Sequence, residues 1–173
     1  MPGAEIKAAV EWLVATAPDP EGCRWDWERN PLGVVLLPAG RNWDVLILPG
    51  DLGRGTLEVL GLLLERPGPV LADSGDARVG FFVPVGTAAG WLGTGIRAAG
   101  RGTWIAVPHP GRTIGARWLV LPDGEGTLTD PAVLELAVHE AAARGALGAR
   151  PRRGGPSEPK GPGRQGSSFG RHP

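Results

Sequence analysis

The 173-residue sequence has few of the residues that staple a fold through covalent bonds or metal ions. Its single cysteine, Cys23, excludes an intramolecular disulfide framework and every zinc site built from several cysteines. Its three histidines, His109, His139 and His172, do not stand at metal-ligand spacings. A chain of this length can bury a sufficient core without such staples. We therefore expect one globular domain and assign no metal or other cofactor to it.

Long hydrophobic runs are also absent from the sequence. No apolar stretch approaches the roughly 20 residues that span a bilayer. The first twelve residues lack the basic start and the apolar core of a signal peptide. We therefore expect a cytoplasmic protein without a membrane partner. Tyrosine is absent and lysine is rare, so most of the basic charge is arginine, a bias typical of GC-rich genomes such as those of actinobacteria.

Charge is balanced overall, with 18 Lys and Arg against 18 Asp and Glu, but it is unevenly distributed. The body is acidic, whereas the C-terminal segment is rich in Gly, Pro and Arg and has Glu158 as its one acidic residue. From Arg150 onward Phe169 is the only large apolar residue, so this segment cannot offset the entropy of ordering. The sequence predicts a domain over 1–146 and a disordered basic tail over 147–173. Such a tail is either a solvated end or an arm that contacts nucleic acid.

The body predicts an α+β fold with a mostly antiparallel sheet and flanking helices, because hairpins dominate the pattern. Arg41-Asn42 allows a hairpin between the first two apolar runs, and a Ser-Gly-Asp turn joins the next two. Trp25 and Trp27 fall in a loop or short strand, and Asp130 caps the last helix ahead of Pro131. The predicted helices are 4–16, 56–66 and 131–144, and the predicted strands, taken in pairs, are 33–40 with 43–50, 69–75 with 77–86, and 103–110 with 116–124.

No common catalytic motif stands out in this pattern. The glycine-rich segment 50–55 lacks the spacing of a dinucleotide fingerprint and the lysine of a P-loop, so it is interpreted as a turn at the start of a helix. Asp73 and Asp76 flank a tight turn, where they either bind a divalent ion or simply form the turn. Cys23 is interpreted as a loop or core thiol, and the seven tryptophans as core residues rather than a base-stacking platform.

Several stretches between residues 33 and 118 resemble one known family. They are WDVLILPGD (43–51), PVLADSGDARVGFFVP (69–84) and GIRAAGRGTWIAVPHP (95–110), the last with a glycine run, an aromatic residue, an apolar strand and a proline pair. They resemble the N-terminal primase–polymerase domain of the bifunctional DNA primase/polymerases, within the archaeo-eukaryotic primase superfamily. With the flanking helices, the resemblance covers most of residues 4–145. It implies the fold of that family, in the degenerate version carried by small actinobacterial proteins.

The chemistry of that family depends on carboxylates that hold two divalent ions and on a histidine that helps to hold the nucleoside triphosphate. The carboxylate pair is expected near residues 48–50, where only the following Asp51 is acidic. The histidine is expected near Val79, but no histidine occurs before Val107. A third aspartate aligns with Arg97, which brings a fixed positive charge. The resemblance therefore implies a domain that has lost primer synthesis.

Three functions stay open. The first is a non-catalytic module that binds a nucleotide, a nucleic acid or a protein, with Arg97 meeting a phosphate and with help from Arg101, Arg112 and Arg117. This function predicts that Arg97, Arg101 and Arg112 converge on one concave face.

The second function is a residual nucleotidyltransferase that uses Mg²⁺ in a site rebuilt from Asp51, Asp73 and Asp76. The third is a regulatory module that binds an unknown protein partner and no nucleotide. This third function predicts an exposed apolar patch that includes Trp91.

Overall fold

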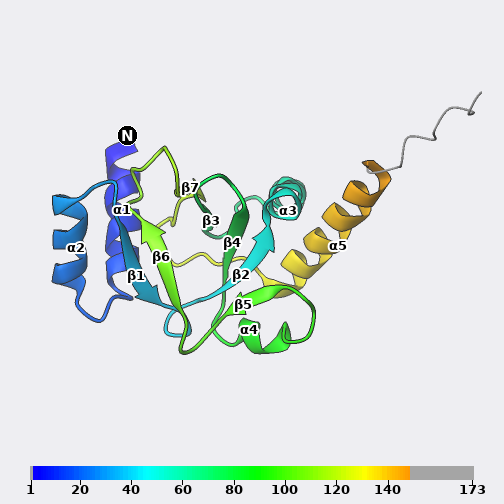
Figure 1. Ribbon diagram of the computed structural model, residues 1–173, viewed down its shortest axis with the longest axis horizontal. Coiled ribbons are helices and arrows are strands. Elements are labelled where there is room, and N and C mark those ends of the chain that lie inside the picture. The colour runs from blue at the N-terminus through cyan, green and yellow to red at the C-terminus, as the bar shows by residue number, and fades with distance from the viewer. Residues whose placement is uncertain (1, 149–173) are drawn as a thin grey trace, which may run out of the picture.

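The computed structural model describes residues 2–148, which form three layers (Figure 1). The middle layer is a five-stranded antiparallel sheet in the order β5-β2-β4-β3-β7. Helices α3 and α5 cover one face of this sheet, and the β1–β6 ribbon with helices α1 and α2 lies over the other. The predicted α+β class, with an antiparallel sheet and flanking helices, is confirmed. None of the described helices is long and apolar enough to cross a membrane.

The elements follow one another along the chain without long gaps. The helices are α1 (Pro2–Val14), α2 (Pro20–Arg29), α3 (Gly50–Leu63), α4 (Thr87–Gly90) and α5 (Pro131–Gly148). The strands are β1 (Val34–Pro38), β2 (Asp44–Pro49), β3 (Val70–Ala72), β4 (Arg78–Val83), β5 (Arg97–Ala99), β6 (Trp104–Pro108) and β7 (Arg117–Val120).

Strands β2 and β4 supply both cores of the domain, because successive side chains of a strand point to opposite faces of the sheet. Leu48 and Phe81 are fully buried in the cluster formed with α3 and α5. Val45 and Phe82 belong to the cluster formed with α1, α2 and the ribbon. Both strands therefore read as almost continuous apolar runs.

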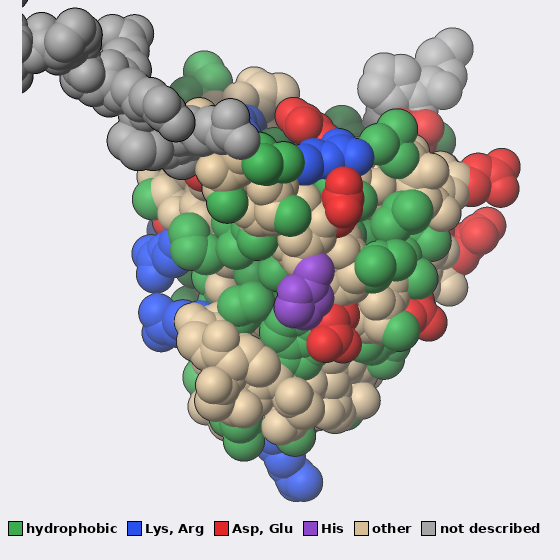
Figure 2. All heavy atoms as spheres, turned by 90° about the vertical axis from the view of Figure 1, so that its right-hand side faces the viewer, with side chains coloured by type: hydrophobic (Ala, Val, Ile, Leu, Met, Phe, Trp, Pro, Cys, Tyr) green, Lys and Arg blue, Asp and Glu red, His purple; other side chains and the backbone are tan. Residues whose placement is uncertain are grey.

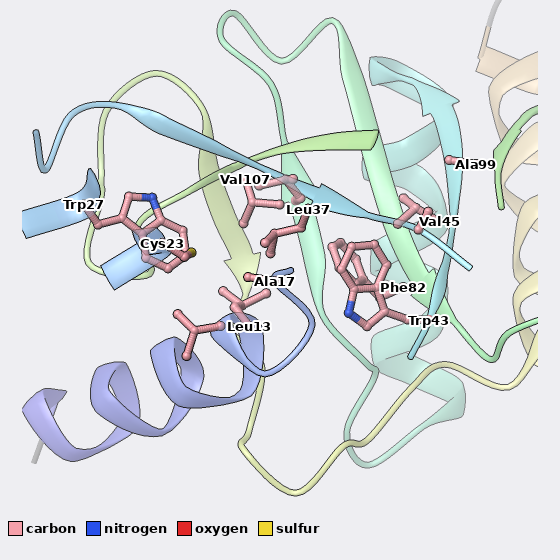
Figure 3. Packing of buried hydrophobic residues seen from close by; sticks show 13 residues of the cluster. Leu13, Ala17, Cys23, Trp27, Leu37, Trp43, Val45, Phe82, Ala99 and Val107 are labelled. Carbon is pink, nitrogen blue, oxygen red and sulfur yellow. The ribbon is translucent and has the colours of Figure 1, made fainter. Parts of the chain in front are cut away.

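Aromatic rings fill the core on the ribbon side. The Phe82 ring lies 4.6 Å from the Trp43 ring, 5.3 Å from Trp118 and 6.4 Å from Trp12, measured between centroids. Figure 3 shows Phe82 and Trp43 side by side, with Leu37 and Val107 of the ribbon facing the same core. Trp27 and Trp43 are core residues as predicted, whereas Trp25 and Trp104 are more than half exposed.

Two local predictions are confirmed in detail. Strands β3 and β4 form the predicted hairpin, with Leu71 opposite Gly80. Asp130 caps α5, because its Oδ1 accepts hydrogen bonds from the backbone N–H groups of Ala132 at 2.8 Å and Val133 at 3.2 Å. The apolar face of α5 packs chiefly on α3, and Ala141 lies close enough to Gly55 to touch a Cβ placed there, at 3.4 Å.

The two outer strand pairings predicted from sequence proximity are wrong. Strand β1 pairs with β6, while β2 pairs with β4 and β5, so 33–40 and 43–50 do not form a hairpin. Strand β7 pairs with β3, so it is not the partner of β6. Gly40 explains why the expected hairpin between 33–40 and 43–50 does not form. It has a φ of 84°, and a Cβ added there would lie 2.4 Å from the backbone of Arg101. This close approach binds the end of β1 to the segment before β6.

Several helix boundaries also differ from the prediction. Trp25 and Trp27 lie in α2, which begins at Pro20 and is capped by the Asp19 side chain through the Gly22 N–H. Segment 50–55 is the beginning of α3 and not a turn before it. Helix α5 continues to Gly148, beyond the expected end at 144 and the predicted domain boundary at 146. The rest of the predicted tail, 149–173, lies outside the described residues.

Two glycines explain why α3 begins so early. A Cβ at Gly50 would lie 1.9 Å from the carbonyl oxygen of Asp76, and a Cβ at Gly53 would lie 2.5 Å from the Cβ of Val79. Only glycine lets the first turns of α3 approach the β3–β4 hairpin this closely. The glycine-rich segment therefore serves helix-to-sheet packing.

Candidate functional site

A cleft of about 280 Å³ opens between the five-stranded sheet and the β1–β6 ribbon. Its floor is apolar, with Val45 and Ile47 from β2 and Leu71 from β3. Val34 and Trp104 of the ribbon contribute to its opposite side, and both are about half exposed. Concave sites with apolar walls and a few charged groups are the usual places for small ligands. The cleft is lined by Val34, Val45, Ile47, Leu71, Ala72, Asp73, Arg78, Gly80, Arg97, Thr103, Trp104, Ile105, Ala106 and Ala116.

The strand register determines which side chains of the sheet face the cleft. Arg97 of β5 stands opposite Ile47 of β2, and Ile47 stands opposite Gly80 of β4. These three positions therefore form one row across the sheet. Leu48 and Val79, near which the metal-binding and histidine positions were expected, are buried on the α3–α5 side instead. Among the described residues, Asp73 is the only carboxylate that lines the cleft.

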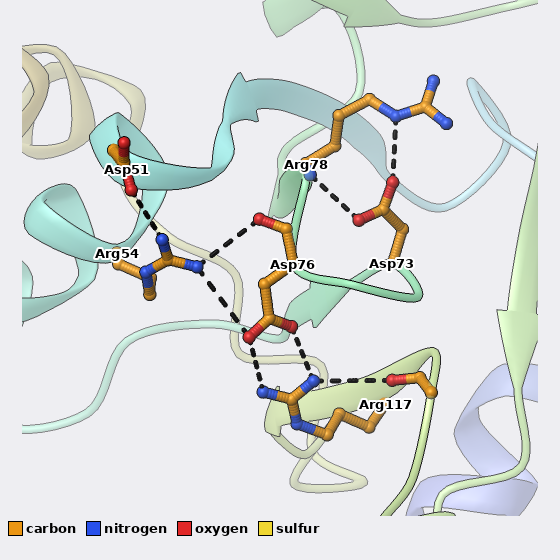
Figure 4. A network of polar contacts seen from close by, with 7 residues as sticks. Asp51, Arg54, Asp73, Asp76, Arg78 and Arg117 are labelled. Carbon is orange, nitrogen blue, oxygen red and sulfur yellow. Dashed lines mark hydrogen bonds and ion pairs between the residues drawn. The ribbon is translucent and has the colours of Figure 1, made fainter.

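Asp73 and Arg78 form an ion pair at the wall of this cleft (Figure 4). Asp73 Oδ2 accepts a hydrogen bond from Arg78 Nε at 3.0 Å, and Asp73 Oδ1 accepts one from the Arg78 backbone N–H at 2.9 Å. Partial burial raises the pKa of Asp73, but the hydrogen bonds from Arg78 outweigh it and hold that pKa below its usual value. Asp73 is therefore ionised at neutral pH, and its charge offsets that of Arg78.

Asp76 forms a second network on the outside of the same turn (Figure 4). The Arg117 guanidinium donates to both carboxylate oxygens of Asp76, at 2.6 and 3.0 Å, and Arg54 Nη1 lies 3.8 Å from Oδ2. The hydrogen bonds from Arg117 lower the pKa of Asp76 and outweigh the effect of burial. This network links the β3–β4 turn to edge strand β7 and to helix α3, so its role is structural.

The three carboxylates offered for a rebuilt metal site do not gather. Asp51 is fully exposed at the start of α3 and pairs with Arg54 at 2.6 Å. Asp73 and Asp76 each face a different arginine. Within residues 2–148 no three His, Cys, Asp or Glu side chains are grouped so that they could hold a metal ion. The residues present do not fit the two-metal centre of nucleotidyl transfer.

The four predicted phosphate-binding arginines also occupy different places. Arg97 lines the cleft, whereas Arg101 lines a neighbouring hollow with Gly40, Arg41 and Trp104. The Arg112 guanidinium donates to the carbonyl oxygens of Ile114 at 2.8 Å and Leu32 at 2.5 Å, and Arg117 is held by Asp76. The expected convergence of Arg97, Arg101 and Arg112 on one concave face is therefore wrong.

The sequence reasoning missed two cleft residues, Arg78 and Trp104. Arg78 begins β4 two residues before Gly80, and this spacing places both on the same face of the strand. Trp104 lines the cleft and the neighbouring hollow together. The two-residue spacing of Arg78 and Gly80 could have revealed Arg78, but no local signal distinguishes Trp104 from a core tryptophan.

Of the remaining candidates for chemistry, Cys23 is buried, His109 is partly buried and His139 is exposed on α5. Cys23 is buried, and burial raises the pKa of its thiol to about 11, so it is unreactive at neutral pH. His109 packs edge-on against Trp27, with ring centroids 5.6 Å apart, and its Nδ1 accepts a hydrogen bond from the Gly111 N–H. Burial lowers the pKa of His109. Neither side chain lines the cleft or the neighbouring hollow.

The α3–α5 side of the molecule carries exposed hydrophobic side chains. Figure 2 shows this side, where hydrophobic groups spread between acidic and basic flanks. Trp91, expected in an exposed patch, is partly buried against the cluster beneath α3 and α5. The exposed large apolar residues of α3 and α5 are Leu62, Leu63, Leu136 and Leu147.

Comparisons with known proteins identify no relative of this chain. No family model, no curated protein and no solved structure gives a significant match to the chain. The function is therefore argued from the cleft itself.

Proposed function

We propose that this protein is a nucleotide-binding module that does not polymerise, in keeping with the resemblance of its sequence to a degenerate primase–polymerase domain. The observation that supports this function is the cleft between sheet and ribbon, which both Arg97 and Trp104 line. Within residues 2–148 the Arg97 side chain makes no ion pair or hydrogen bond with another residue, and it is exposed.

The two residues offer complementary chemistry to the two ends of a nucleotide. An arginine guanidinium presents paired N–H groups that match a phosphate, and it stays charged at all physiological pH values. An exposed tryptophan ring can stack on a base, which contributes roughly 1–3 kcal/mol per base. The apolar floor of Ile47 and Leu71 shields the sugar and base from water. A nucleotide is the ligand class that uses all three features.

Polymerisation is not part of this proposal, because the charges in the cleft have the wrong sign for it. Two divalent ions at the reacting phosphates need several carboxylates, and Asp73, which already pairs with Arg78, is the only one in the cleft. Arg97 would repel a cation bound beside it. In this proposal the arginine itself takes the position of the ion and binds phosphate directly.

Calorimetric titration of the purified full chain with nucleotides, in the presence of EDTA and then of Mg²⁺, tests this function. We expect binding with EDTA present, and we expect Arg97→Gln to weaken it at least about tenfold, since a hydrogen bond to a charged group is worth roughly 1.5–3 kcal/mol. Arg144→Gln is the matched control, because among residues 2–148 Arg144 pairs only with Glu140, on the exposed side of α5. A primer-extension assay of the same sample should show no incorporation.

Two results would contradict the proposal. The first is the absence of any binding heat or rise in melting temperature with ribonucleotides or deoxynucleotides. The second is Mg²⁺-dependent incorporation that disappears in Asp73→Asn, which would restore the nucleotidyltransferase alternative.

A further inference from the structure

The cleft carries one uncompensated positive charge. Its ionisable side chains are Asp73, Arg78 and Arg97. Asp73 and Arg78 neutralise each other through the 3.0 Å contact, while Arg97 pairs with no carboxylate in the described part of the chain. The charge available to a ligand is therefore that of a single guanidinium.

The Asp73–Arg78 pair is held in place by the backbone as well as by its charges. Asp73 Oδ1 accepts the Arg78 N–H at 2.9 Å, and the Asp73 backbone N–H donates to the Arg78 carbonyl at 3.1 Å. Rotating Arg78 towards a ligand would leave the Asp73 carboxylate beside that ligand without a partner. A phosphate that reaches Arg78 therefore also meets the negative charge of Asp73.

Resting on the nucleotide-binding function proposed above, we propose that the cleft selects ligands with one phosphate group, the nucleoside monophosphates, and that Asp73 is the residue that rejects longer phosphate chains. The first phosphate meets Arg97, which has no other partner. Each further phosphate extends into a cleft whose second arginine is already neutralised by a carboxylate. Asp73 thus acts as a repulsive element that sets specificity.

The neighbouring hollow supplies the competing expectation. Arg41 and Arg101 line it, and Trp104 borders both it and the cleft. A phosphate chain that bent around Trp104 towards Arg101 would gain a second positive partner. Such a path would make a triphosphate bind more tightly than a monophosphate, so affinity as a function of phosphate number separates the two arrangements.

The test is a calorimetric titration of the full chain, with EDTA, against adenosine, AMP, ADP and ATP and against the corresponding guanine series. We expect AMP or GMP to bind at least about tenfold more tightly than its triphosphate, since each further phosphate adds a like-charge contact with Asp73. Asp73→Asn keeps the oxygen that accepts the Arg78 N–H but removes the charge. It should raise triphosphate affinity about tenfold and change monophosphate affinity little.

Asp51→Asn is the matched control, because it also removes a carboxylate paired with an arginine but does not line the cleft. It should leave every affinity unchanged. If Asp73→Asn does not fold, Arg78→Gln tests the same idea in the opposite direction. It leaves the Asp73 charge unpaired, so the affinity for every phosphate ligand should fall, and the affinity for the triphosphate should fall most.

The outcomes distinguish a failure of the monophosphate selectivity from a failure of the proposed nucleotide binding. Triphosphate binding as tight as monophosphate binding, still lost in Arg97→Gln, would overturn the selectivity and leave nucleotide binding intact. Equal effects of Asp73→Asn and Asp51→Asn would remove Asp73 from the explanation. Absence of binding by any member of either series would overturn both.

Discussion

The two faces of the central sheet differ in how completely they are covered. On one face, α3 and α5 close over Leu48, Phe81 and their neighbours, an apolar cluster beside which buried Thr56 donates its hydroxyl to the Leu52 carbonyl. On the other face, the ribbon covers only part of the sheet and leaves the cleft with Asp73, Arg78 and Arg97 at its wall and floor. Buried charge is costly unless it is paired. The one buried carboxylate of the described strands, Asp44 at the start of β2, is held by hydrogen bonds from the Gly86 and Ala88 N–H groups. The comparison therefore teaches that the charged side chains open to a ligand lie on the incompletely covered face, which is the face used in the proposed function.

The largest effect is expected from opening the core on the ribbon side. Phe82→Ala removes the ring that contacts Trp12, Trp43 and Trp118 behind the cleft. Truncation of a fully buried phenylalanine costs about 3–5 kcal/mol of unfolding free energy. Urea denaturation followed by tryptophan fluorescence measures this loss. A cost below about 1 kcal/mol would mean that this side of the sheet is not a packed core.

Gly53→Ala tests the helix-covered face. The new Cβ would lie 2.5 Å from the Val79 Cβ, so α3 or β4 must move, and we expect a loss of about 1–3 kcal/mol. Gly61→Ala on the same helix is the control, because nothing lies within 4 Å of a Cβ there. It should stabilise the protein by up to about 1 kcal/mol through helix propensity. If Gly53→Ala and Gly61→Ala changed the free energy of unfolding in the same direction, the close packing of α3 on the sheet would be contradicted.

Acid should affect the two aspartate networks and leave the helix-covered core unchanged. The pKa of Asp76 is lowered by the hydrogen bonds from Arg117, so its ionised form is stabilised in the folded state. This contribution is complete above the usual aspartate pKa of about 3.9 and is lost as pH falls through the lower folded value.

Melting temperature measured between neutral pH and about pH 3 should therefore fall on acidification. Asp76→Asn should make that fall shallower with little change in the fold, because asparagine tolerates the φ of 55° found at this position. An identical pH dependence in the variant would show that Asp76 contributes nothing to stability.

Much of the fold follows from local sequence signals. The β3–β4 hairpin, the Asp130 cap and the apolar runs of β2 and β4 are each determined within a few residues, and all are predictable. Strand pairing across the molecule is not predictable in this way. The partner of β1 depends on Gly40 meeting the backbone of Arg101, a contact between distant segments that no local pattern records.

The same limit applies to the candidate site. The sequence offered Arg97 as a candidate only through an expected resemblance to primase–polymerases, and its isolation from the other charges of the described residues depends on the strand register. Arg112 and Arg117 look equivalent to it in the sequence, yet one holds two loop carbonyls and the other holds Asp76. The sequence shows an arginine at both 97 and 117. Only the tertiary structure shows that Arg117 is paired with Asp76 while Arg97 has no partner among the described residues.

The β1–β6 ribbon also determines at which stage of folding the cleft forms. Strands β1 and β6 belong to the early and late parts of the chain, so their pairing must wait for a long loop to close. The sheet hairpin β3–β4 and the α3 segment are local and can form sooner. We therefore expect the cleft to be completed near the end of folding, and a chain cut before Trp104 to have no ribbon at all. A ligand that touches both sheet and ribbon would slow unfolding by holding together the parts that meet last.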